Sequence, residues 1–255
     1  MDSFPLPSTI TITDAPDGQR TSVVVEPLAP GYGTTIGNAL RRVLLSSLVG
    51  AAVTDVRVQG VDHEFSTIPN VKEDVVDIIL NLKNLRFRVH TDESVTLTLS
   101  ARGKKQVHAK DIEDNAQVEV VNPNALIATL TADEGTLDME LTVRRGRGYL
   151  PTELREKEER PIGMLAIDAL FSPVRNVGIR IDPVRVGQMT NYERLILTME
   201  TDGSITAEEA VKNAARVLLD HFQFVESLGV LTDAGSNEDA LEQTTAEIET
   251  EQPKS

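Results

Sequence analysis

Two strongly amphipathic segments, one near each end of the chain, constrain the fold more than any other feature of the sequence. They cover residues 34–48 and 206–228. In both, apolar residues recur every three or four positions, which is the spacing of a helix with one buried face. The apolar positions are Ile36, Leu40, Val43, Leu44 and Leu48 in the first segment, and Val211, Ala215, Leu218, Phe222 and Val225 in the second. The sequence therefore predicts two long helices.

Signals for the ends of these helices are also present. Thr34 or Thr35 can cap the first helix and Gly50 can end it. Residues 206–209 have the pattern of a capping box at the start of the second helix. Further apolar residues make its apolar arc wider than one contact needs, so we expect this helix to pack against two partners.

Between the two helices the chain consists mostly of short β-like runs. A hairpin is predicted over residues 3–26, with its turn at Asp17 and Gly18. The later runs are residues 53–58, 85–89, 95–99, 118–121, 126–130, 137–143, 177–181 and 195–199. Two stretches, residues 71–82 and 162–171, predict shorter helices. This mixture indicates an α+β fold, with an α+β insertion between the two long helices.

Composition limits the classes of function. The 255 residues include no Cys and only 4% aromatic residues, and the formal net charge is -15. Disulfides and thiolate chemistry are thereby excluded, and broad binding of nucleic acid is disfavoured. Because the sequence has no secretory signal and no apolar run of roughly 20 residues, we expect a cytoplasmic protein without membrane contact. Residues 232–255 are acidic and poor in large apolar residues, and we expect a disordered tail.

A glycine-rich turn at Gly31, Gly33 and Gly37 opens the first predicted helix. Backbone amides at such a position can bind phosphate. The third glycine, however, comes one residue too late for a dinucleotide-binding motif, and no strand leads directly into the turn. We therefore favour a structural interpretation, in which Gly31 and Gly33 shape the turn and Gly37 allows close packing of the helix.

One dense basic cluster follows the predicted strand at residues 137–143. It consists of Arg144, Arg145, Arg147 and Arg155, with Tyr149 as the accompanying aromatic residue. The cluster could bind nucleic acid or the acidic surface of another protein. Alternatively, it is a solvated basic loop without a partner. We favour the loop, because glutamates that follow it would reduce its field at a distance.

No self-contained active site is evident. The four histidines, His63, His90, His108 and His221, are far apart and lack metal-ligand spacing, so we expect ordinary surface or half-buried side chains. We expect no catalytic residue, cofactor or metal ligand in this chain. Two helices with wide apolar faces are explained most simply by an interface such as a homodimer. The alternative is that the β segments cover these faces within one chain.

Several stretches resemble the α subunit of bacterial DNA-dependent RNA polymerase. Residues 25–47, VEPLAPGYGTTIGNALRRVLLSS, resemble the signature helix of this family. Further similar stretches follow in order, at residues 60–67, 73–83, 145–151 (RGRGYLP), 159–163 (ERPIG) and 171–174 (FSPV). The resemblance covers about residues 9–231, which is nearly the whole predicted folded region.

The resemblance implies a two-lobed protein. Residues 1–49 and 174–231 would form a dimerisation lobe of antiparallel sheet and two long helices, and residues 50–173 an inserted, mainly β lobe. Members of the family dimerise through the first and last helices, which carry the ten apolar positions named above. The dimer binds the β subunit with one protomer and the β′ subunit with the other. Catalytic carboxylates and Mg²⁺ are expected in those partners.

The resemblance also suggests contact residues. Arg41 and Arg42 fall where the family contacts β, and Arg42 is the preferred anchor because a guanidinium binds carboxylates or carbonyls in a fixed fork. Arg145, Arg147 and Tyr149 form a candidate contact loop for polymerase subunits. The family usually continues into a C-terminal domain that contacts promoter DNA, whereas these 255 residues end in the acidic tail. We therefore expect DNA contact only through the assembled enzyme.

Two other hypotheses rank below this one. The chain could be an independent dimeric protein-binding module, which would be functional without large partners. It could also be a nucleotide-binding enzyme that uses the glycine turn, in which case nucleotides would stabilise it.

Overall fold

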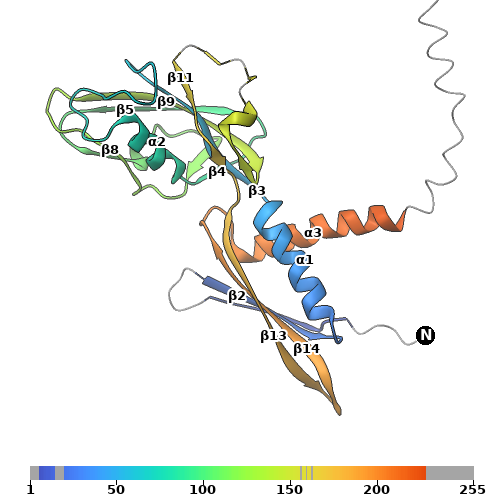
Figure 1. Cartoon of the computed structure of the whole chain (residues 1–255). Helices are drawn as coiled ribbons and strands as arrows, with labels where there is room; N and C mark the ends of the chain where they lie inside the picture. Colours follow the sequence, from blue (N-terminus) through green and yellow to red (C-terminus); the bar gives the residue numbers. More distant parts are fainter. Residues whose placement is uncertain (1–5, 15–19, 156, 159, 162, 228–255) are drawn as a thin grey trace, which may run out of the picture. The chain divides into compact units, whose positions relative to one another are not determined.

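The computed structural model describes residues 6–14, 20–155, 157–158, 160–161 and 163–227 (Figure 1). This part of the chain contains three α-helices and several antiparallel sheets, which confirms the predicted α+β class. The division into a dimerisation lobe and an inserted lobe stays a prediction. The chain separates after Ala214 into two compact units. No helix in the described residues is long and apolar enough to cross a membrane.

The first four-stranded antiparallel sheet joins segments from both ends of the sequence. Its order is β1-β2-β14-β13. The strands are β1 (Thr9–Asp14), β2 (Arg20–Leu28), β13 (Val174–Val186) and β14 (Met189–Thr201). β1 and β2 pair antiparallel, which confirms the predicted hairpin, although its turn lies outside the described residues. Helix α1 (Tyr32–Ser46) packs on β13 and β14 (Figure 1).

A second four-stranded antiparallel sheet, of order β11-β3-β9-β5, lies in the middle of the sequence. Its strands are β3 (Val49–Val58), β5 (Val95–Arg102), β9 (Thr136–Arg147) and β11 (Met164–Ala166). Along β5, and along β9 as far as Val143, every second residue is buried. These residues share one hydrophobic core with α2 (Val75–Lys83), to which Ile78 and Leu82 contribute. The period of two explains why β5 and β9 were recognisable as strands.

Short elements complete this region. The paired strands are β4 (Phe87–Val89) with β7 (Val118–Val120), β6 (Gln106–His108) with β8 (Leu126–Thr129), and β10 (Tyr149–Leu150) with β12 (Ala169–Leu170). Two 3₁₀ turns, η1 (Ala109–Asp111) and η2 (Thr152–Arg155), lie between them. The predicted helix over residues 71–82 begins only at Val75, because the side chain of Asp74 accepts the Asp77 N–H and caps the helix there.

The predicted helix over residues 162–171 is wrong. The chain forms β11 and β12 instead, and its buried residues are Leu165, Ile167, Ala169 and Phe171. These alternate with less buried residues, which is the period of a strand and not of a helix. A short apolar run fits both periods in the sequence, and pairing of β11 with β3 decides between them.

Helix α3 (Ala207–Glu226) is the last described helix. The Thr206 hydroxyl accepts the Glu209 N–H, and the Glu209 carboxylate accepts the Thr206 N–H, both at 3.2 Å, which confirms the predicted capping box. Small residues are buried in its first half, namely Ala207, Ala210 and Ala214. From Ala215 onward the helix belongs to the second unit. The predicted acidic tail, residues 232–255, lies outside the described residues.

Candidate partner-binding surfaces

The glycine turn before α1 is filled by a carboxylate of the same chain. The N–H groups of Gly31 and Gly33 donate to Oε1 and Oε2 of Glu193, each at 2.8 Å. Gly31 has a φ of 83°, a conformation that glycine adopts without strain. These amides are the donors that a phosphate would need, so the geometry favours the structural interpretation of the turn over a phosphate site.

Gly37 allows the close packing that was predicted for it. A Cβ atom at this position would lie 2.9 Å from Leu195 and 3.2 Å from Ile179, which belong to β14 and β13. The predicted boundaries of the helix were less accurate. Thr34 and Thr35 lie inside α1 and do not cap it, and α1 ends at Ser46 because the chain enters β3 before Gly50.

The apolar stripe of α1 is largely used within the chain. Leu40 and Leu44 are buried, and Ile36 and Val43 are half-buried; Leu48, which was predicted to belong to the stripe, is buried just beyond the end of the helix. Arg41 and Arg42 are both exposed. The helix therefore presents a basic face to solvent, and most of its apolar residues already have partners in this chain.

The second half of α3 has the opposite character. Of the predicted interface residues, Val211 and Leu218 are half-buried, whereas Ala215, Phe222 and Val225 are exposed. Phe222 and Val225 are 64% and 58% exposed, and Leu219 and Phe224, which were not predicted, are 54% and 62% exposed. Large apolar side chains exposed on one helix indicate a protein contact.

The basic cluster is organised differently from the predicted loop. Arg144, Arg145 and Arg147 lie within β9, because this strand continues to residue 147. Arg145 pairs with Asp92 and Arg144 pairs with Glu158 at 3.5 Å. Arg147 is exposed. The predicted loop is therefore wrong for these residues, because β9 pairs with β3 as far as Arg147. The predicted solvent exposure is confirmed for Arg145 and Arg147.

Arg155 was predicted to belong to the same solvated cluster, but it is only 2% exposed. Its guanidinium donates to the carbonyl of Thr54 at 3.0 Å and to both carboxylate oxygens of Asp55 at 3.0 and 2.8 Å. It also donates to Glu158. Burial disfavours its charge, but the bonds to Glu158 and Asp55 outweigh this effect and raise the pKa of Arg155.

An apolar groove between α2 and the segment at residues 164–168 was missed by the sequence analysis. It has a volume of ≈ 460 Å³. Phe65 and Leu80 on its rim are 78% and 51% exposed. The groove also contains an ion pair of 2.8 Å between Lys83 and Asp168, and the hydrogen bond from Lys83 lowers the pKa of Asp168. No local pattern could predict it, because two segments far apart in sequence form its walls.

Tyr149 lies near this groove. It is 59% exposed, and partial desolvation and the Asp168 carboxylate raise the pKa of its phenol. Asp168 also accepts the N–H of Thr152 at 3.0 Å. The structure thus associates Tyr149 with the groove, while Arg145 pairs elsewhere with Asp92.

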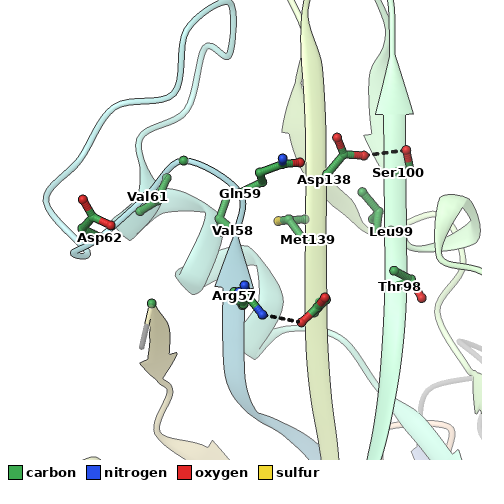
Figure 2. A pocket seen from close by; sticks show the side chains of 13 residues that line it. Arg57, Val58, Gln59, Val61, Asp62, Thr98, Leu99, Ser100, Asp138 and Met139 are labelled. Carbon is green, nitrogen blue, oxygen red and sulfur yellow. Dashed lines mark hydrogen bonds and ion pairs between the residues drawn. The ribbon is translucent and has the colours of Figure 1, made fainter. Parts of the chain in front are cut away.

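A second hollow of ≈ 460 Å³ lies over the polar face of β3, β9 and β5 (Figure 2). Two polar pairs lie along it, since Arg57 lies 3.5 Å from Glu140 and Ser100 donates to Asp138 at 2.6 Å. Figure 2 shows these two pairs reaching between neighbouring strands. Among the described residues, no group of three acidic or His side chains could hold a metal ion. This hollow is therefore best described as the solvated face of a sheet.

The four histidines have the predicted surface or half-buried character, with His63, His90 and His221 exposed and His108 half-buried. The described residues thus offer exposed basic side chains on α1 and exposed apolar side chains on α3 and beside α2. Exposed apolar surfaces of this kind are typical of a protein that binds other proteins.

Comparison with known proteins identifies the family. A family model described as the RNA polymerase Rpb3/RpoA insert domain matches residues 56–172. The chain is 49% identical over 224 residues to the α subunit of DNA-directed RNA polymerase from Carboxydothermus hydrogenoformans, covering 86% of this chain and 71% of the relative. The corresponding protein of Heliobacterium modesticaldum is 52% identical over 205 residues, covering 80% of this chain and 65% of the relative. That of Symbiobacterium thermophilum is 49% identical over 222 residues, covering 87% and 70%. The chain therefore belongs to the α-subunit family of DNA-directed RNA polymerase.

Proposed function

We propose that this chain works in transcription as an α subunit of DNA-directed RNA polymerase. Two copies form a homodimer, and the dimer holds the large β and β′ subunits together. The family membership supports the association with polymerase subunits. The observation that carries the dimer is the exposed apolar end of α3, because large apolar side chains on a solvent-exposed helix are stabilised by an apolar partner.

The dimer contact centres on the second half of α3. Phe222 and Val225 are more than half exposed, whereas Leu40 and Leu44 of α1 are buried within the chain. A charge at Leu40 would therefore disturb folding first, and a charge at Phe222 would disturb association first. Ile36 and Val43, which are half-buried, supply the remaining apolar surface of α1.

The contact with β uses the basic face of α1. Arg41 and Arg42 are exposed on this helix, and no acidic residue lies in its first turn. A guanidinium that projects from a helix can bind a carboxylate or two carbonyl oxygens in a fixed geometry, so Arg42 is a suitable anchor.

The apolar groove beside α2 is a further contact for one of the two large subunits. Its rim residues Phe65 and Leu80 are exposed, and the Lys83–Asp168 pair supplies a polar site at one wall. A partner segment with one large apolar side chain and a flanking charge fits this chemistry. Catalytic carboxylates, Mg²⁺ and direct DNA contact belong to the assembled enzyme in this proposal.

The substitution Phe222→Asp tests the dimer. We expect the variant to fold but to be monomeric, because a carboxylate in an apolar contact loses its hydration. We also expect affinity capture with it to recover fewer β and β′ subunits than capture with the wild-type chain. Light scattering after gel filtration measures the oligomeric state, and mass spectrometry measures the captured subunits.

The matched control is Phe65→Asp, which changes another largely exposed phenylalanine, in the apolar groove. It should remain dimeric. A monomeric wild-type chain would contradict the homodimer, and a wild-type chain captured without large subunits would favour an independent binding module.

A further inference from the structure

The start of α1 is held by a residue distant in the sequence. Glu193 lies in β14, 162 positions from Gly31 and 160 positions from Gly33. Its two carboxylate oxygens accept one N–H each, from the residue before α1 and from the first turn of α1. The first N–H groups of a helix have no partners within the helix and carry partial positive charge, so a carboxylate satisfies them well.

No local residue performs this role. The N-cap residue is Gly31, which has no side chain to form a capping bond. No acidic residue lies in the first turn of the helix. The hydroxyl of Thr35 donates to the carbonyl of Gly31 and so does not bind the N–H groups of Gly31 and Gly33. Glu193 is therefore the anion of this helix start.

The turn is shaped to fit the carboxylate. A Cβ atom on Gly33 would lie 2.7 Å from Oε2 of Glu193 and 3.3 Å from Ile181. The strand is adapted as well, because the register of β14 with β2 shifts between Glu193 and Leu195. A register shift in a strand re-aims the side chains on either side of it.

We infer that Glu193 is a positioning residue that fixes the start of α1 on β14 and thereby places the basic face of the helix. Arg42 follows Gly31 along one continuous helix, roughly 16–17 Å further on at 1.5 Å per residue. A shift of the helix start is transmitted to Arg42, because α1 moves as a rigid element. The role of Arg42 in this inference rests on the proposed function, whereas the role of Glu193 at the helix start does not.

Chemical rescue in the full chain tests the inference. Glu193→Ala removes the carboxylate that accepts the N–H groups of Gly31 and Gly33. Acetate carries the same carboxylate group and can occupy the vacated space. We expect the melting temperature of the variant to fall by roughly 4–8 °C, because two hydrogen bonds to a charged group are lost. Acetate that replaces chloride at constant ionic strength should raise the melting temperature of the variant again and recover much of the loss.

Glu140→Ala is the matched control, since Glu140 forms an ion pair with Arg57 on a sheet face and bonds no helix start. Its melting temperature should respond to acetate as the wild-type chain does. An unchanged melting temperature in Glu193→Ala, or a fall that acetate restores no better than in Glu140→Ala, would overturn the inference.

Capture of the β subunit separates this inference from the proposed function. Glu193→Ala should capture β several-fold less well and regain capture in acetate. Arg42→Ala should lose capture and gain nothing from acetate. If Arg42→Ala lowers capture and Glu193→Ala does not, the positioning role is refuted. If neither variant changes capture while acetate rescues the melting temperature, the proposed Arg42 contact fails and Glu193 remains the anchor of the helix start.

Discussion

Glu193 and Arg155 both anchor a segment that is distant in the sequence, but they do so in different environments. Each uses one charged side chain to hold a segment more than 90 positions away in sequence, as shown by the separations of 162 for Glu193 to Gly31 and 101 for Arg155 to Thr54. Glu193 is half-buried and binds neutral amides. Arg155 is 2% exposed and binds Asp55, which is 3% exposed. The comparison predicts that the buried anchor depends on each partner far more strongly.

The physical reason is the cost of burying charge. Water or a small ion can reach the partners of a half-buried anchor when its side chain is removed. A buried guanidinium that loses its carboxylate has no such replacement and keeps its desolvation cost. Arg160 also donates to Asp55, at 3.2 Å, so loss of this carboxylate leaves two cations without their shared partner.

The largest effect is therefore expected for Asp55→Ala. We expect the free energy of unfolding to fall by about 3–5 kcal/mol, which is typical when one member of a buried ion pair is removed. Urea unfolding of the full chain measures this change. Glu140→Ala removes the partner of the exposed Arg57 and should cost less than about 1 kcal/mol. Equal losses in the two variants would remove the distinction between buried and exposed anchors.

The sequence predicted what depends on local pattern. The amphipathic spacing located α1 and α3, and the capping box at Thr206 was recognised because its partners lie three residues apart. The glycine turn was correctly interpreted as a structural feature. These elements are specified by neighbours in the chain, so one sequence contains the information needed.

Both anchors escaped prediction for the same reason. Nothing near Gly31 indicates that its partner is Glu193, and nothing near Arg155 indicates that it is buried against Asp55. Their roles arise only when strand pairing brings distant segments together. Arg155 was assigned to a solvated cluster because charge is usually exposed, and this expectation fails where a carboxylate is buried beside it.

An intermediate effect is expected for Gly33→Ala. This substitution perturbs the contact between Gly33 and the half-buried Glu193. The new Cβ would lie 2.7 Å from the Glu193 carboxylate, so either the side chain or the start of α1 must move. We expect a loss of roughly 1–3 kcal/mol in urea unfolding. Gly178→Ala is the control, because its Cβ would meet only Thr198, at 3.8 Å, and we expect little change or slight stabilisation. A Gly33→Ala chain as stable as wild type would show that the turn tolerates displacement of Glu193.

The smallest effect is expected for Glu158, the solvent-accessible partner of buried Arg155. Its side chain is 41% exposed, and the hydrogen bond from Arg155 lowers its pKa below the ordinary value of 4.5. A carboxyl group with a lowered pKa in the folded state stabilises the fold above its unfolded pKa, and this contribution is lost as the pH falls through the folded pKa. Wild type should therefore lose more stability than Glu158→Gln on acidification below about pH 4.5, by less than about 1 kcal/mol because solvent screens the pair. Unfolding free energies of both chains across this pH range measure the difference. Parallel curves would mean that Asp55 alone sustains the buried arginine, which would sharpen the contrast with Glu193 further.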